Sequence, residues 1–216
     1  MPRPTPSSGP VSTPTRPFRQ FFVPREQPDE RCELCAEPIA GDHAHLVNIV
    51  DRRLMCVCSA CRFLFSAPGS GGNRFRSVPD RYVSLPASDS LNVAWNALAI
   101  PVDLAFVFVN SQRQRAVAFY PSPVGATESE LLPEAWQALQ GTSSDLATLV
   151  DDVEALLVRK NNDGSLSAFL VPIDVCYELV GRLRQTWKGF QGGDEAWREI
   201  AAFMHRIVVR AGEVAR

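Results

Sequence analysis

The chain has 216 residues, of which 45% are hydrophobic, and its formal net charge is −2. This length suggests one or two domains with an ordinary globular core, and the charge lacks the positive excess typical of nucleic-acid-binding domains. No apolar run is long enough to span a membrane and the N-terminus carries no apolar secretory signal, so we expect a cytoplasmic protein.

Residues 1–28 hold eight of the 17 prolines, with serine, threonine and glycine between them. Such a segment buries too little apolar surface to offset the entropy that it would lose on ordering. We therefore predict a disordered tail over residues 1–28. Phe18, Phe21 and Phe22 lie near its end. They either pack on the domain that follows or form a short docking motif for a partner.

Five of the six cysteines lie close together in the next segment, and four of them form two Cys-x-x-Cys hooks. The hooks are Cys32/Cys35 and Cys58/Cys61, with 22 residues between them. Each hook places two thiolates on one side of an ion, so two hooks complete a tetrahedron. The separation is slightly longer than the usual value of about 15–20 residues. Thiols stay reduced in the cytosol, which favours metal ligation over disulfides. We predict a metal site with these four ligands, for Zn²⁺ or, as the alternative, iron.

Three further side chains in this segment are candidates for an additional metal site or for contact with the ligands: Cys56, His43 and His45. Cys56 precedes Cys58 by two residues, so both side chains point to one face if the segment is extended. Cys56 is therefore a ligand, a spare thiol or a neighbour that supports a ligand. Either histidine can replace a cysteine ligand, and the alternative is that both are solvated loop residues.

Residues 29–84 are predicted to form a small zinc-ribbon-like module. Residues 43–50 have strand-like content, residues 51–53 suggest a turn, and residues 53–57 return as a second strand that leads into the second hook. The segment has few other apolar residues. Its folding should therefore depend on the cation, whose binding contributes about 10–16 kcal/mol in small zinc domains.

Arginine and aromatic residues alternate after the second hook and suggest an interface. We predict that Arg62, Phe63, Arg74, Phe75 and Arg76 bind a partner. Arginine and aromatic residues are enriched at protein interfaces, and they also suit single-stranded nucleic acid. A protein partner is preferred. The plain alternative is that Phe63 and Phe65 belong to the core and the arginines are solvated.

Residues 85–216 are predicted to form an α+β domain. One β-hairpin pairs 104–109 with 115–120, and a second pairs 153–159 with 166–171 around a turn at 161–164. Helices are expected at 88–99, 172–187 and 194–211, and at 127–140, where Thr127 and Glu130 resemble a capping box. Together these elements predict an antiparallel sheet of two hairpins with helices packed on one side.

No arrangement of residues typical of an active site is present, so we expect a protein without enzymatic activity. The sequence has neither a nucleophile elbow nor a His-Glu-x-x-His motif, and the acidic cluster at 151–154 is interpreted as a solvated edge. HNH nucleases also carry Cys-x-x-Cys hooks around a hairpin. His45 and Asn48 could correspond to two of their active-site residues, but Arg62 stands where the third, a histidine, is needed.

The cysteine module, followed by WNALAIPVDLAFVF (95–108) and AFYPSPVGATES (118–129), resembles an uncharacterised, mainly actinobacterial family, a domain of unknown function with a zinc-ribbon-like module. The resemblance covers about residues 30–212. The genes of this family lie beside those of nickel–iron hydrogenases. The resemblance thus implies an assembly or electron-transfer accessory of a hydrogenase.

The sequence therefore predicts a non-enzymatic metal-binding accessory protein, whose partners are hydrogenase subunits or maturation factors. A closed four-thiolate zinc site positions residues and performs no chemistry, because it has no open coordination position. One alternative is a rubredoxin-like electron-transfer module, although Ala36 and Arg62 replace the glycine that follows each rubredoxin hook. The other is a nucleic-acid-binding zinc-ribbon protein.

Overall fold

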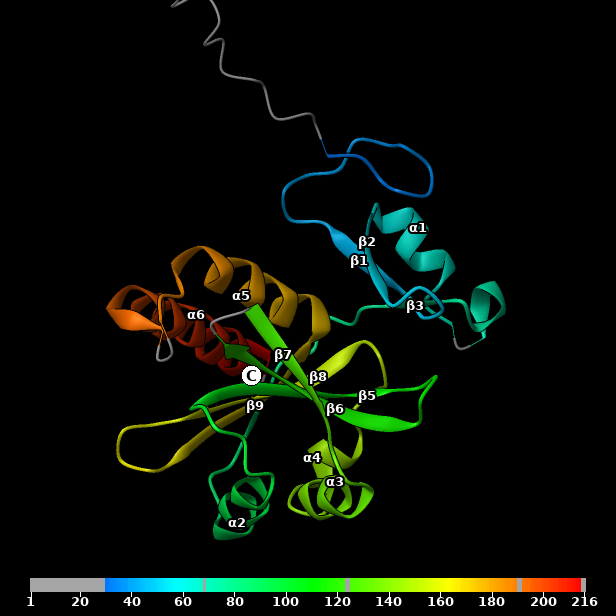
Figure 1. Cartoon of the computed structure of the whole chain (residues 1–216). Helices are drawn as coiled ribbons and strands as arrows, with labels where there is room; N and C mark the ends of the chain where they lie inside the picture. The colour runs from blue at the N-terminus through cyan, green and yellow to red at the C-terminus, as the bar shows by residue number, and fades with distance from the viewer. Residues whose placement is uncertain (1–29, 68, 123–124, 190–191, 215–216) are drawn as a thin grey trace, which may run out of the picture.

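The computed structural model describes residues 30–67, 69–122, 125–189 and 192–214. The tail predicted at residues 1–28 lies outside the described residues. The described chain forms two antiparallel sheets, one of three strands and one of six, with helices around them (Figure 1). No helix in these ranges is long and apolar enough to cross a membrane.

The smaller sheet contains the predicted cysteine hairpin. Its order is β2-β1-β3, with β1 (Ala44–Asn48), β2 (Arg53–Val57) and β3 (Phe75–Ser77). Helix α1 (Ser59–Leu64) and the 3-10 helix η2 (Ser70–Asn73) connect β2 to β3. The hairpin of β1 and β2 is confirmed, whereas the third strand was not predicted. This part of the structure agrees with a small module that carries two Cys-x-x-Cys hooks, but it does not establish a zinc-ribbon fold.

The two faces of the smaller sheet pack on different cores, because side chains alternate along a strand. On one face Leu46, Met55 and Val57 pack with two of the cysteines. On the other face Val47 and Ile49 join the core that the larger sheet forms with α5 and α6. The smaller sheet therefore separates the four-cysteine group from the rest of the molecule.

The larger sheet has the order β4-β9-β8-β5-β6-β7, and all its neighbouring strands are antiparallel. Both predicted hairpins are confirmed, and they join through β5 and β8. The strands are β4 (Val83–Leu85), β5 (Leu104–Asn110), β6 (Arg115–Ser122), β7 (Gly125–Glu130), β8 (Glu154–Lys160) and β9 (Leu166–Pro172). The predicted boundary between the two domains falls inside β4, and the division into domains stays a prediction.

Helices cover both faces of the larger sheet, so the expectation of helices on one side is wrong (Figure 1). Phe106 and Phe108 face one core and Ala105 and Val107 face the other. A strand that is apolar on both sides needs cover on both sides. Helices α5 (Ile173–Thr186) and α6 (Gly193–Val214) cover the first face, and α2 (Asp89–Ala97), α3 (Pro133–Gln140) and α4 (Ser144–Ala147) lie on the second.

The predicted capping box is also wrong, because Thr127 and Glu130 lie in β7. Thr127 pairs with Tyr120 and Glu130 with Val117 across the β6–β7 ladder. Helix α3 begins later, at Pro133. Proline is favoured at the first position of a helix, where its missing N–H has no intrahelical partner to lose.

Candidate metal centre

The first hook is a tight turn before β1. An isolated bridge between Arg31 and Pro38 closes the turn, and the Cys32 amide donates to the Glu37 carbonyl at 2.8 Å. The Ala36 amide donates to the Cys32 carbonyl at 2.8 Å, and Ala36 has a φ of 63°. The backbone of this turn therefore sets the positions of both thiols in the hook.

The second hook lies at the start of α1. Cys58 is the N-cap residue, and its sulfur accepts a hydrogen bond from the Cys61 amide at 3.4 Å. Backbone N–H groups at a helix N-terminus favour negative charge, so this position suits a thiolate. One side chain thus both caps the helix and offers a metal ligand.

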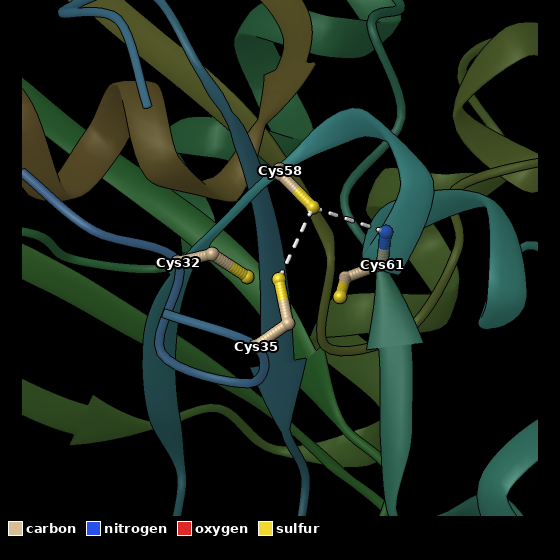
Figure 2. A group of neighbouring side chains, drawn as sticks. All are labelled: Cys32, Cys35, Cys58 and Cys61. Atoms are coloured by element: carbon tan, nitrogen blue, oxygen red, sulfur yellow. Dashed lines mark hydrogen bonds between the residues drawn. The ribbon is translucent and has the colours of Figure 1, made fainter. Parts of the chain in front are cut away.

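The four sulfurs converge from the two hooks, as Figure 2 shows. They all lie within 4.8 Å of one another, and Cys35 Sγ is 3.7 Å from Cys58 Sγ. A tetrahedral zinc site with Zn–S bonds of about 2.3 Å requires sulfurs about 3.8 Å apart. The group can therefore hold one metal ion after small adjustments. The same four thiolates suit zinc or iron.

The pKa values of Cys32, Cys35 and Cys61 are shifted in different directions by their surroundings. Burial raises the pKa of Cys32, but the backbone N–H groups of Cys58, Cys35 and Leu34 outweigh it and lower the value to about 6. Burial and the neighbouring thiols raise the pKa of Cys61 to about 12. For Cys35, the backbone N–H of Glu37 lowers the pKa, but hydrogen bonds with Cys32 and Cys58 outweigh it and raise the value. Four anions so close together need a cation, and a bound dication holds coordinating thiols deprotonated.

The other three candidate ligands form a separate group on the opposite face of the hairpin. One ligand atom from each of His43, His45 and Cys56 lies within 4.8 Å of those of the other two. Cys56 is still within β2, whereas Cys58 lies beyond its end, so the two cysteines join different groups. Neither histidine replaces a thiol of the four-cysteine group. His45 instead contacts Asp174 at the start of α5, a residue that the sequence suggested only as a helix cap.

Two of the predicted partner-binding arginines make contacts inside the molecule. Arg62 donates to Ser77 Oγ and to the Val78 carbonyl, both at 3.2 Å. Arg76 donates to the Asp151 carbonyl at 2.7 Å and to Asp152 Oδ2 at 3.3 Å. Arg62 thus joins α1 to the end of β3, and Arg76 joins β3 to the turn before β8.

The other three predicted interface residues differ in exposure. Phe75 packs on Phe65 with ring centroids 5.2 Å apart, and Arg74 lies over the Phe75 ring. Phe63 is 80% exposed, and its neighbour Leu64 is 67% exposed. Two adjacent apolar side chains on α1 therefore face solvent. Partner binding by the five residues stays a prediction.

The acidic cluster is not a solvated edge, so that interpretation is wrong. Asp152 and Glu154 are buried, and they pair with Arg76 and Arg81 at 3.3 and 3.1 Å. Buried carboxylates of this kind are normally paired. The arginine-rich stretch before β4 was the available signal, but its partners lie more than 70 residues away.

The structure also contains a cavity that the sequence did not indicate. It lies between α5 and strands β5 to β7, has a volume of about 450 Å³, and is lined mainly by apolar side chains such as Phe106, Phe119 and Leu183. Trp187 lines it as well, and its buried Nε1 has no hydrogen-bond partner among the described residues. A cavity of this size is typical of small-molecule sites.

The fold and the cysteines define a mixed α/β protein with a four-cysteine group that can bind a metal ion. The chain belongs to a family of unknown function (DUF5947), which matches residues 31–211. The expectation of an uncharacterised family over nearly these residues is thereby confirmed. No curated protein and no solved structure matches the chain.

Proposed function

We propose that this protein is a metal-binding accessory protein without enzymatic activity. In this proposal the four thiolates of Cys32, Cys35, Cys58 and Cys61 hold Zn²⁺, and the metal fixes α1 so that its exposed apolar side chains bind a protein partner. The observation that carries the proposal is the double role of the second hook. Cys58 and Cys61 belong to the four-cysteine group and also form the first turn of α1.

Helix α1 needs such support because it is short. It has six residues, and isolated helices shorter than about 12–15 residues are marginal in water. The core beneath it contains few side chains: Cys32, Leu46, Met55, Val57 and Cys61. A metal ion that links Cys58 and Cys61 to the first hook supplies the missing constraint.

Zinc is the preferred metal because a closed four-thiolate site is typical of structural zinc. The absence of an open coordination position supports a positioning role and a protein without its own catalysis. The sequence resemblance supports nickel–iron hydrogenase subunits or their maturation factors as partners. We also propose a cytoplasmic location, where thiols stay reduced and can bind a metal. The alternatives are electron transfer by iron in the same site and nucleic-acid binding.

The metal is tested by purifying the full chain without oxygen and measuring its metal content and absorption spectrum. Cys58→Ser should lose one equivalent of zinc relative to the wild type, and neither protein should be coloured. Cys176→Ala is the matched control, because Cys176 is fully buried in another core and its loss should leave metal content unchanged. Iron with visible absorption would favour electron transfer. Equal metal content in the wild type and Cys58→Ser would refute the proposed site.

The role of the metal is tested by hydrogen exchange. Chelation should increase exchange in residues 58–66 while β5 and β8, at the centre of the larger sheet, stay protected. Unchanged exchange in α1 would contradict the claim that the metal holds this helix.

The interface is tested by binding to purified nickel–iron hydrogenase subunits and maturation factors. Phe63→Ser should abolish binding while leaving metal content and stability unchanged, since an exposed side chain contributes little to folding. Val93→Ser is the matched control, because Val93 is 71% exposed on α2, away from the metal module. Equal binding by both variants would exclude α1 as the docking surface, and binding to single-stranded nucleic acid instead would favour that alternative.

A further inference from the structure

A second group of potential metal ligands lies on the face of the β1–β2 hairpin that packs toward the larger sheet. His45 and Cys56 are direct cross-strand partners, so their side chains lie on one face. His43 precedes His45 by two residues, and the two imidazole centroids are 4.7 Å apart. The three side chains offer ligand atoms within 4.8 Å of one another.

The hydrogen bonds of the two histidines leave the same ring nitrogen free on each. His45 Nδ1 lies 2.8 Å from Asp174 Oδ2, and His43 Nδ1 lies 2.8 Å from the Ala40 carbonyl. A carboxylate and a carbonyl only accept, so each Nδ1 carries the hydrogen. Each Nε2 then has a lone pair available. A carboxylate that orients a histidine in this way is typical of metal ligands.

His43 shows that this site is incomplete without a further atom. Its side chain is only 9% exposed. Its Nε2 is buried and has no hydrogen-bond partner among the described residues. Buried polar atoms are nearly always partnered, because an unpartnered one has lost its hydrogen bonds to water without replacement. A bound cation at Nε2 supplies the missing partner.

We propose that His43, His45 and Cys56 form a second metal site, distinct from the four-cysteine group. The donor set of two imidazole nitrogens and one thiolate selects a first-row transition cation such as Zn²⁺ over the oxygen-preferring Mg²⁺ and Ca²⁺. A tetrahedral ion would have its ligand atoms about 3.3–3.8 Å apart, so the three groups must converge by about 1 Å. A fourth coordination position stays open for water or another ligand.

Two carboxylates lie beside the site, and one of them, Glu33, also pairs with Arg53 at 2.7 Å. Glu30 Oε2 lies 3.4 Å from His43 Nδ1, and Glu33 Oε1 accepts a hydrogen bond from the Cys56 amide at 2.8 Å. Formation of the sulfur–metal bond releases the thiol proton of Cys56 to solvent.

The site also connects distant parts of the chain. Asp174, which orients His45, is in the first turn of α5, whereas both histidines belong to the cysteine module. A metal at this position would therefore strengthen the attachment of the smaller sheet to the larger one.

The proposal is tested with Co²⁺ as the probe, added to the full chain after metal removal under reducing conditions. The wild type should bind two equivalents. Cys56→Ser and His43→Gln should each bind one and keep the intense absorption of the four-thiolate site. Cys58→Ser should keep the other equivalent, with weaker sulfur-to-cobalt absorption because one thiolate contributes instead of four.

His205→Ala is the matched control, because His205 is an exposed histidine on α6 and its loss should leave two equivalents bound. Asp174→Asn should weaken the second site about 10–100-fold and leave the first unchanged. One equivalent in the wild type with the intense four-thiolate absorption present, or two equivalents in both His43→Gln and Cys56→Ser, would overturn the proposal. One equivalent in the wild type without that absorption would refute the proposed function and leave this second site standing.

Discussion

The ion pair between Arg81 and Glu154 should make a large contribution to stability, and Arg81→Met tests it. Glu154 is 1% exposed, and its carboxylate accepts from Arg81 Nη1 at 3.1 and 3.3 Å and from the Val150 amide at 2.8 Å. Arg81 also donates to Thr148 Oγ1 at 2.7 Å. The substitution keeps the apolar stem and leaves a buried carboxylate with one backbone donor.

The expected cost follows from the burial of the two partners. Removing one partner of a buried ion pair costs about 3–5 kcal/mol, because the other charge remains buried and unpaired. The Arg81 side chain is 29% exposed, so solvent screens the pair and the lower end, about 3 kcal/mol, applies. For a chain of this size, about 2–4 °C of Tm are lost per kcal/mol, which predicts a decrease of about 6–12 °C.

Urea unfolding followed by tryptophan fluorescence measures this loss. Arg115→Met is the matched control, since Arg115 pairs with Glu130 at 3.1 Å but both side chains are largely exposed. The control should cost less than about 1 kcal/mol. Combining Arg81→Met with Glu154→Gln should cost less than the two changes separately, because they share one interaction. Equal costs for Arg81→Met and Arg115→Met, or full additivity in the double variant, would refute the reasoning.

Two further perturbations test local features. Burial raises the pKa of Tyr82 from 10.0 to about 12, so the folded state holds this proton more tightly than the unfolded state. Stability should therefore fall by about 2 kcal/mol from pH 10 to 12. Tyr82→Phe should lack this part of the decline in urea titrations, and parallel pH profiles of the two proteins would contradict the prediction. Gly71→Ala should destabilise the protein more than Gly72→Ala: both glycines have positive φ, but only at Gly71 would the added methyl meet Phe65, at 2.6 Å. Equal Tm values for the two would contradict this.

The elements that the sequence predicted correctly are those defined by local patterns. The turn residues at 161–164 and the apolar runs beside them define the β8–β9 hairpin without reference to the rest of the chain. Thr127 and Glu130 show where local reasoning fails. Their spacing matches a capping box, but β6 offers an unpaired edge, and pairing along it satisfies the same backbone groups. Alternatives of this kind are decided by tertiary contacts.

In the candidate site, too, local spacing predicted some features, whereas others depend on tertiary contacts. Spacing alone identified the four cysteines, because each hook is a local turn. The arrangement around His45 could not be found from spacing, since it depends on the cross-strand register with Cys56 and on Asp174, 129 residues away. The partners of Arg76 are also distant in sequence, at 75 and 76 residues. Without such contacts, an arginine-rich stretch resembles a solvated or partner-binding surface.

The two groups of potential metal ligands lie on opposite faces of the smaller sheet, so a metal bound to each would affect a different part of the protein. The four-cysteine group lies on the face that carries α1, so in our proposal a metal bound there would fix the positions of Phe63 and Leu64. The group of two histidines and Cys56 lies on the face that contacts α5 through Asp174. Loss of the first metal should therefore affect partner binding and leave the sheets attached. Loss of the second metal should loosen the attachment of the smaller sheet to the larger one while α1 stays folded. Hydrogen exchange would therefore increase in a different region for each metal, and this difference distinguishes their effects.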